Sequence, residues 1–366
     1  MNEDERFPAL VAREDDEGRF ALRLEERRVA DLPAGELLIR VDYSSLNFKD
    51  ALSAEGNRGV TKRYPHTPGI DAAGQVVASA VSAYSPGDEV VVTGFDLGMN
   101  TPGGWGRYIR VPAAWALPLP RGLSVREAME IGTAGLTAAL AVTRLLAATR
   151  ASGGEAAGAK DAGGAPAHPS AASAGFGAAP GAGTSQLPFV VSGASGGVGS
   201  FAVALLAVTG RTVVAVSGKP DAAAYLRELG AAEVVGRDEV TDRSERLLLS
   251  ARWSGGVDTV GGPILSTLLR QTAPLGAVAA CGNAMEARFD ANVYPFILRA
   301  VSLLGIDAAS CPRELRVALW TRLAGDWREA WKRVRMTDCT LADLPAQVAL
   351  MRSGHLLGRV VVDLAS

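Results

Sequence analysis

Residues 189–199 read Phe-Val-Val-Ser-Gly-Ala-Ser-Gly-Gly-Val-Gly, and this stretch decides the fold of the 366-residue chain. A short apolar run breaks into a glycine-rich turn, and the apolar stretch 201–208 follows it, which we interpret as strand, turn and helix. Glycines let a turn approach a pyrophosphate closely, and a helix N-terminus offers free N–H groups to phosphate oxygens. The stretch therefore predicts a dinucleotide-binding site, although a glycine-rich turn in another α/β protein has the same composition.

The next strand predicts which dinucleotide is bound. Residues 212–216 are an apolar strand that ends in Ser217, Gly218 and Lys219. Enzymes that use NAD usually carry an acidic residue at this strand end, where it binds the ribose 2′-hydroxyl. A hydroxyl, a glycine and a cation stand here instead and suit a 2′-phosphate, so we expect NADPH as the cofactor.

Strands and helices alternate toward the C-terminus. Apolar runs that we interpret as strands lie at 189–192, 212–216, 233–236, 257–260, 277–281 and 303–306. With helices between them, they predict a doubly wound parallel Rossmann sheet of six strands. Residues 19–120 hold short strands separated by turns, which predicts a small β-barrel-like domain. Helices are expected from Ser124, which forms a capping-box pattern with Glu127, and over 135–146.

We expect an α/β protein in which the first domain is discontinuous in sequence. Residues 1–126 supply most of that domain, residues 127–308 form the Rossmann domain, and residues 309–366 return to the first domain. Within the Rossmann part, residues 151–186 contain no Val, Ile or Leu. Such a segment buries too little apolar surface to offset its ordering entropy. We interpret it as a flexible insertion in preference to a functional lid.

Composition excludes several classes of function. The formal net charge of −2 gives no basic surface for nucleic acid. No apolar run approaches the ~20 residues that span a bilayer, and the acidic N-terminus is not a secretory signal. The three cysteines and three histidines lack the clustered spacing of a zinc site. We therefore expect a cytoplasmic protein with no metal, no membrane contact and no nucleic-acid partner.

Several blocks of sequence resemble one family when they are taken together. They are Ser44-Ser45-Leu46-Asn47-Phe48-Lys49-Asp50, Pro68-Gly69-Ile70-Asp71, Ile131-Gly132-Thr133-Ala134-Gly135, Ala279-Ala280-Cys281-Gly282, Pro295-Phe296-Ile297-Leu298-Arg299 and Gly358-Arg359. In this order the blocks resemble the zinc-independent group of acrylyl-CoA reductases and quinone oxidoreductases in the medium-chain dehydrogenase/reductase superfamily. The resemblance covers nearly the whole chain except the first residues and the 151–186 segment.

The resemblance implies a GroES-like catalytic domain, a Rossmann domain and a homodimer. Zinc-dependent members of the superfamily have Gly-His-Glu where this chain has Gly69-Ile70-Asp71, and a ligand cysteine near Leu46. Both departures remove metal ligands, which disfavours carbonyl reduction by a Lewis acid. The chemistry that remains is hydride addition to an activated C=C bond or to a quinone.

The resemblance also places the NADPH contacts. The residues carried over from the family are Phe48, Ser195, Gly196, Gly197, Val198, Ser217, Gly218, Lys219, Arg237, Asn283, Ile297, Ala308 and Arg359. Many relatives have Arg where this chain has Lys219, and a lysine keeps the charge but not the bidentate fork. Without the family, Arg237 reads as an ordinary surface arginine at a strand end.

Phe48 stands where the family usually has a tyrosine that contacts the cofactor. The ring is kept and the phenol is lost. If relatives use that hydroxyl as a donor, this chain needs another, and Asn47, Ser45, Thr133 and solvent are the alternatives. We leave the catalytic residue unassigned, with Asn47 and Thr133 as candidates.

The predicted reaction is NADPH-dependent reduction of the C=C bond of acrylyl-CoA or a close 2-enoyl-CoA. An NADPH:quinone oxidoreductase is the alternative enzyme, and a non-catalytic nucleotide-binding redox sensor is the alternative of another class. Arg58, Lys62 and Arg63 follow the 44–50 block and are candidates for binding CoA phosphates, although a solvated basic loop has the same composition.

Overall fold

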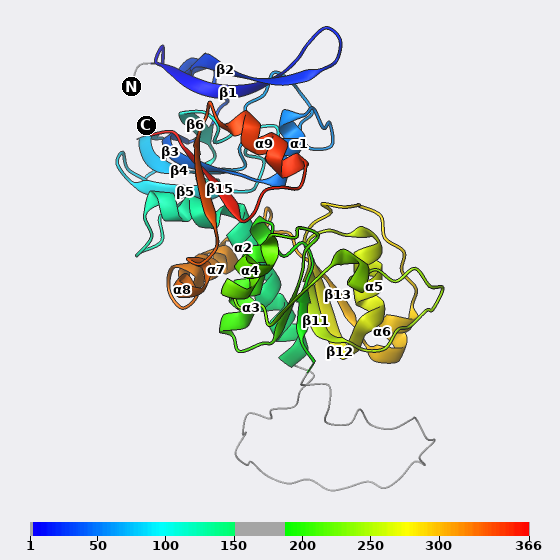
Figure 1. Ribbon diagram of the computed structural model, residues 1–366. Helices are drawn as coiled ribbons and strands as arrows, with labels where there is room; N and C mark the ends of the chain where they lie inside the picture. Colours follow the sequence, from blue (N-terminus) through cyan, green and yellow to red (C-terminus); the bar gives the residue numbers. More distant parts are fainter. Residues whose placement is uncertain (1–2, 151–186, 366) are drawn as a thin grey trace, which may run out of the picture.

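The structure is a computed structural model that describes residues 3–150 and 187–365, so the predicted insertion at 151–186 lies outside the described residues. Two sheets of different kinds form two lobes, and helices lie between them (Figure 1). The upper lobe in this view contains both the N-terminal strands and the last strand of the chain.

The lower lobe is a parallel sheet of six strands in the order β10-β9-β8-β11-β12-β13. Its strands are β8 (Phe189–Val191), β9 (Val213–Val216), β10 (Glu233–Val235), β11 (Trp253–Asp258), β12 (Thr272–Ala280) and β13 (Ser302–Gly305). The helices that connect them are α3 (Gly197–Val208), α4 (Ala222–Glu228), α5 (Gly262–Gln271) and α6 (Tyr294–Arg299). Strand order reverses between β8 and β11, and ligands bind at such a point, outside the carboxyl ends of the strands. The predicted Rossmann sheet is confirmed.

The upper lobe is a mostly antiparallel sheet in the order β14-β15-β3-β4-β5-β7, with β6 paired to β3. Its strands are β3 (Leu37–Leu46), β4 (Asp71–Ser79), β5 (Glu89–Thr93), β6 (Tyr108–Val111), β7 (Ala116–Pro118), β14 (Met336–Thr340) and β15 (Arg359–Asp363). Strand β15 is an interior strand of this sheet, because it lies between β14 and β3. The C-terminal residues therefore complete the sheet that the N-terminal residues begin.

A hairpin of β1 (Arg6–Glu14) and β2 (Phe20–Arg28) covers one side of the upper lobe (Figure 1). The sequence pattern predicted strands only from Arg19 onward, so β1 is an addition to the expected fold. The hairpin holds the loop that follows α1 (Phe48–Ala54): Arg58 forms an ion pair with Glu14 at 2.5 Å and lies over the rings of Phe20 and Tyr64.

Helix α2 (Val125–Arg150) runs between the two lobes. The predicted capping box is confirmed, since Ser124 and Glu127 exchange side-chain and backbone hydrogen bonds of 2.9 and 3.2 Å. Two helices were expected, from Ser124 and over 135–146, and α2 indeed consists of two helical halves separated by a break at Gly132, where φ is 50° and ψ is −159°. Over 125–149 it is long and apolar enough to cross a bilayer, contrary to our expectation, but 72% of its 18-residue apolar segment is buried within the protein. Such burial is typical of a core helix.

The remaining helices pack around the junction of the lobes. They are α7 (Arg313–Ala324), α8 (Arg328–Trp331) and α9 (Leu344–Arg352), with short 3-10 helices at Val29–Asp31, Ala113–Trp115 and Arg237–Val240. Helices α7 and α8 contact α2 and α3, whereas α9 packs on α1. The largest apolar cluster joins α2, α3, α7 and the inner faces of both sheets, which makes the two lobes one packed unit.

Candidate active site

A cleft of about 380 Å³ lies between the lobes, at the carboxyl ends of the Rossmann strands. The glycine-rich turn forms its floor. Gly193 has φ of +58°, and a Cβ there would lie 2.2 Å from Oγ1 of Thr259, so only glycine fits. Because α3 begins at Gly197, its first N–H groups face the cleft as a site for an anion.

Two cations lie at one end of the cleft. Lys219 follows β9, and its ammonium donates to the carbonyl of Leu356. Arg237 lies across the backbone of Gly218, where a Cβ would come within 2.6 Å of the guanidinium Nε. Burial, and then the charge of Arg237, lowers the pKa of Lys219. Two cations that repel each other across a glycine form a site that an anion would stabilise.

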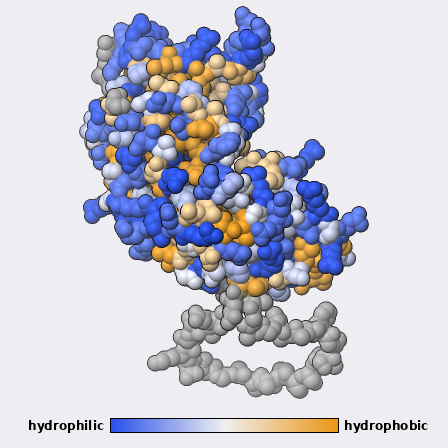
Figure 2. All heavy atoms as spheres, viewed as in Figure 1, coloured by the Kyte–Doolittle hydropathy of each residue, from blue (hydrophilic) through white to orange (hydrophobic). Residues whose placement is uncertain are grey.

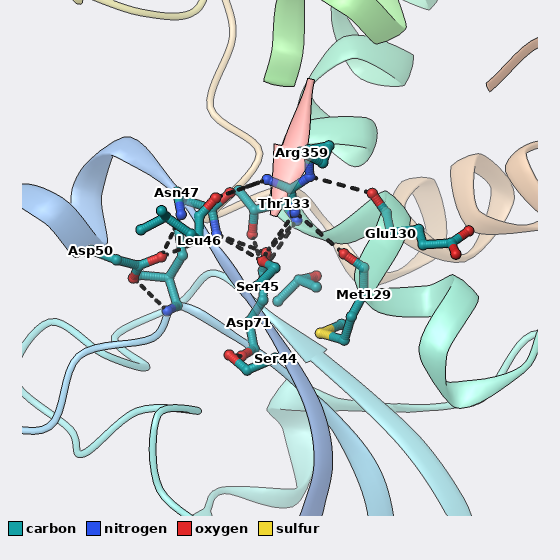
Figure 3. Close-up of polar contacts among 12 residues, drawn as sticks. Ser44, Ser45, Leu46, Asn47, Asp50, Asp71, Met129, Glu130, Thr133 and Arg359 are labelled. Carbon is teal, nitrogen blue, oxygen red and sulfur yellow. Dashed lines mark hydrogen bonds and ion pairs between the residues drawn. The ribbon is translucent and has the colours of Figure 1, made fainter. Parts of the chain in front are cut away.

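At the opposite side of the cleft a buried carboxylate gathers the polar side chains of the upper lobe (Figure 3). Asp71 begins β4 and is fully buried. It accepts hydrogen bonds from the hydroxyl of Ser45 (2.6 Å), from Nδ2 of Asn47 (2.9 Å), and from the hydroxyl and the N–H of Thr133 (2.5 and 2.9 Å). Asp71 is therefore an acceptor for three of the residues that we considered as proton donors.

Arg359, the first residue of β15, is the cation of this cluster. Its Nη2 lies 3.6 Å from Asp71, and the guanidinium donates to Oδ1 of Asn47 at 2.9 Å and to three carbonyls, those of Leu46, Met129 and Glu130. Burial lowers its pKa, and the charges of the neighbouring aspartates oppose that shift. Arg359 lines the cleft, but its donors are directed at the protein, so it offers a ligand its charge more than its hydrogen bonds.

Asp50 is a second buried carboxylate, and the sequence did not single it out as functional. It accepts from the N–H groups of Asn47 and Ile70 at 2.8 Å each. Burial, together with the charge of Asp71, raises the pKa of Asp50 to about 7. The spacing of Asn47 and Asp50 is a capping box for α1, and this was the available sequence signal.

The hydrogen bonds of Asn47 and Thr133 show whether either candidate catalytic residue can donate a proton to a substrate. Asn47 lines the cleft, but its Nδ2 group is shared among Asp71, Asp50 and Ser45. Thr133 does not line the cleft, and its hydroxyl points at Asp71. Neither candidate has a free proton to offer in this arrangement.

Phe48 lies on the cleft wall, as expected for a cofactor contact. The guanidinium of Arg352 lies 5.1 Å from the centre of its ring and donates to Glu55 at 2.8 Å. Arg352 also lines the cleft and was not predicted. No feature of the sequence indicated this contact, because Arg352 reaches Phe48 only through the packing of α9 on α1.

The structure brings most of the predicted cofactor residues into one cleft. Those that line it are Asn283, Phe48, Ser195, Gly196, Gly197, Val198, Ser217, Gly218, Lys219, Arg237 and Arg359. Two do not reach it. Ile297 lies on α6 with 67% of its surface exposed, and Ala308 is buried, with its carbonyl accepting from Arg316. The geometry of a single chain therefore gives no direct cofactor contact at Ile297 or Ala308.

The basic loop predicted for CoA lies outside this cleft. Arg58 is held by Glu14 and two rings, so its charge is already paired. Lys62 and Arg63 are exposed. As to metals, residues 3–150 and 187–365 contain no group of three or more His, Cys, Asp or Glu side chains placed to hold an ion.

The fold and the cleft define an oxidoreductase of the medium-chain dehydrogenase/reductase superfamily, and the chain belongs to it. Residues 33–121 match the alcohol dehydrogenase GroES-like domain, and residues 197–324 match the zinc-binding dehydrogenase family. The resemblance stated from the sequence is thereby confirmed.

Within the superfamily the chain is similar to acrylyl-CoA reductases and to a putative quinone oxidoreductase. It is 41% identical to the acrylyl-CoA reductase AcuI of Ruegeria pomeroyi over 98% of this chain and 99% of the relative. It is 38% identical to the putative quinone oxidoreductase YhfP of Bacillus subtilis over 91% and 92% of the two chains. The yhdH oxidoreductase of Salmonella enterica, solved in complex with NADP, superposes with a TM-score of 0.84 at 37% identity, covering 98% and 99%.

Proposed function

We propose that this protein reduces the C=C bond of acrylyl-CoA, or of a close 2-enoyl-CoA, with NADPH in the cytoplasm. One observation carries the cofactor assignment: the glycine-rich turn and the Lys219–Arg237 pair open into the same cleft. The substrate assignment is supported by the 41% identity to an acrylyl-CoA reductase along the whole chain. The structure of a relative in complex with NADP supports the choice of dinucleotide.

In this proposal different walls of the cleft bind different parts of NADPH. The turn Ser195–Val198 binds the pyrophosphate at the start of α3. Ser217, Gly218, Lys219 and Arg237 bind the 2′-phosphate, since two cations outside a carboxylate's reach suit a dianion. Phe48, Asn283 and Arg359 then border the rest of the cofactor, with Arg359 adding positive charge.

When bound, NADPH supplies the hydride that adds to the β-carbon of the substrate. Ser45, Asn47 and Thr133 already donate to Asp71 and have no proton to give to the α-carbon. We therefore assign that proton to solvent, and Asn47 has the role of shaping the wall beside the reacting atoms. An enolate needs no strongly tuned acid, so the lack of a spare donor is compatible with the reaction.

A quinone reductase is the second candidate, favoured by the 38% identity to a putative quinone oxidoreductase. A non-catalytic redox sensor is the third, and the exchange of the family tyrosine for Phe48 favours it. NADPH oxidation with acrylyl-CoA, with a quinone and with neither separates them. The proposal expects fast oxidation with acrylyl-CoA alone. Oxidation with the quinone only, or with neither, would refute it.

CoA would require cations beyond the cofactor cleft. Lys62 and Arg63 are the two residues of the basic loop whose charges are not paired with a carboxylate within 4 Å in the described part of the chain. Neutralising both should raise the KM for acrylyl-CoA and leave quinone reduction unchanged. Equal effects on the two substrates would return the loop to a solvated surface.

We also propose a homodimer formed through the edge of the Rossmann sheet. Figure 2 shows apolar side chains over α6, and Val293, Ile297 and Leu298 are each at least 60% exposed there. The neighbouring strand β13 ends the sheet and leaves an unpaired edge. Ile297→Asp should convert a dimer to a monomer in light scattering, and a monomeric wild-type protein would refute the proposal.

A further inference from the structure

Helix α2 is broken at Gly132, and an ion pair from two strands of the upper lobe fills the break. In an unbroken helix the N–H of Thr133 would donate to the carbonyl of Met129, four residues earlier. Here the Thr133 N–H donates to Asp71 at 2.9 Å, and the Met129 carbonyl accepts from Arg359 at 3.4 Å. The ion pair of Asp71 and Arg359 thus replaces one hydrogen bond of the helix.

The break lies where α2 passes from one lobe to the other. Before it, Arg126 forms an ion pair at 2.7 Å with Asp338 of β14, in the upper sheet. Beyond it, Gly135 packs against Phe201 of α3, and Leu145 lies beside the backbone of β11, in the Rossmann lobe. The two halves of α2 are therefore held by different lobes, and the break lies between them.

The pair fits the break closely. A Cβ at Gly132 would lie 2.5 Å from both Nη2 of Arg359 and Oδ2 of Asp71. On its other side the Arg359 side chain passes the glycine-rich turn, since a Cβ at Gly197 would lie 3.1 Å from its Cδ. The same arginine contacts the break in α2 and the floor of the cleft.

We propose that Asp71, acting through Arg359, is the positioning residue that fixes the orientation of the two lobes and so the way the walls of the cofactor cleft face each other. The inference goes beyond the proposed activity, because Asp71 touches neither cofactor nor substrate. It rests on the proposed function only in using NADPH as a probe.

Two ligands and three matched pairs of variants test this. NADPH spans both walls, whereas 2′,5′-ADP occupies the Rossmann wall alone. Gly132→Ala should weaken NADPH by about tenfold or more and 2′,5′-ADP by less than about threefold, a tenfold change being about 1.4 kcal/mol. Gly210→Ala is its control, because Gly210 has φ of +77° with nothing within 4 Å of a Cβ.

The second pair is Asp71→Asn with Asp42→Asn as its control. Asp42 is an aspartate of β3 that forms ion pairs with Arg40 and Arg107 near the surface. The third is Thr133→Val with Thr137→Val, because the Thr137 hydroxyl donates only to the Thr133 carbonyl of its own helix. Thr133→Val keeps the ion pair and should fold even if Asp71→Asn does not. It should weaken NADPH by about threefold, and Thr137→Val should leave it unchanged.

Spin labels at Ser82→Cys and Arg227→Cys, exposed on the upper and Rossmann lobes, report their separation without any ligand. Gly132→Ala should shift or broaden that distance, and Gly210→Ala should not. Equal distances in both variants would overturn the inference, as would equal weakening of NADPH and 2′,5′-ADP. A wild-type protein that binds neither ligand would refute the proposed cofactor, and the label distances, measured in Asp71→Asn and Asp42→Asn as well, would still decide the role of Asp71.

Discussion

The two sides of the cofactor cleft differ in whether their charged groups are paired within the protein. Around Asp71 every donor is used within the protein: Ser45, Asn47, Thr133 and Arg359 all face one carboxylate. At the other end Lys219 and Arg237 line the cleft, and within the residues that the structure describes neither forms an ion pair, the Lys219 ammonium donating to the carbonyl of Leu356. A charged group that is buried and paired can affect a ligand only by positioning the surrounding protein. Where cations are left without a counterion, they can act directly on a ligand.

The strongest way to break this comparison is to remove the buried cation. Arg359→Met leaves Asp71 buried beside Asp50 without its ion pair, which should cost about 3–5 kcal/mol of unfolding free energy. Arg237→Met, at the open end, should cost less than about 0.5 kcal/mol. Urea unfolding at pH 8 measures both, and similar losses would mean that the two ends do not differ.

Asp50 sharpens the comparison through pH. Its pKa is raised to about 7 in the folded protein, whereas the unfolded chain ionises this carboxyl near its ordinary pKa. As pH rises from about 4 to about 7, ionisation favours the unfolded chain, so this carboxyl lowers the unfolding free energy by a few kcal/mol. Above pH 7 its effect is constant. Asp50→Asn should lack this slope, and unfolding curves that run parallel to wild type across the window would contradict the assignment.

At the open end, Lys219→Asp should raise the KM for NADPH by about tenfold or more, because a charge-assisted contact to phosphate contributes about 1.5–3 kcal/mol. Preference should shift toward NADH. Steady-state kinetics with the two cofactors measures the ratio, and Lys332→Asp, directly after α8 and outside the cleft, is the control. An unchanged ratio in Lys219→Asp would remove this residue from the 2′-phosphate site.

The smallest expected effect is that of Phe48→Tyr. The ring packs under Arg352, and the proposed proton comes from solvent, so a restored phenol should change turnover of acrylyl-CoA by less than about threefold. A faster variant would show that the hydroxyl of relatives takes part in the reaction. A variant that binds NADPH and is inactive would contradict the placement of Phe48 beside the cofactor.

Much of the fold was predictable because its signals are local. The strands at 189–191 and 213–216 are apolar runs that end in glycine turns, and the strand at 89–93 follows a Pro-Gly-Asp turn. Of the hairpin only β1 was missed, because β2 lies within residues 19–120, which were predicted to form strands. The break in α2 was predicted, since helices were expected from Ser124 and over 135–146, on either side of Gly132.

The sequence predicted which residues belong to the candidate site, but not what each of them does there. Ser45, Asn47 and Thr133 were identified as polar residues near the reaction, but only the folded chain shows that all three donate to Asp71, up to 62 residues away. The basic loop illustrates the reverse error. Its charges are visible in the sequence, whereas the pairing of Arg58 with Glu14 depends on a hairpin that was not predicted.

The place of β15 has a consequence for synthesis on the ribosome. Val360 pairs with Leu46, so one of the earliest strands receives this neighbour only when the last residues of the chain emerge. The Rossmann lobe has all its strands before then and can fold while translation continues. The upper lobe must wait, with residues 43–46 of β3 unpaired on the edge that β15 joins and Asp71 still lacking its arginine, which β15 delivers last. We therefore expect chains truncated before Arg359 to be captured by chaperones with a folded Rossmann lobe and an open first domain.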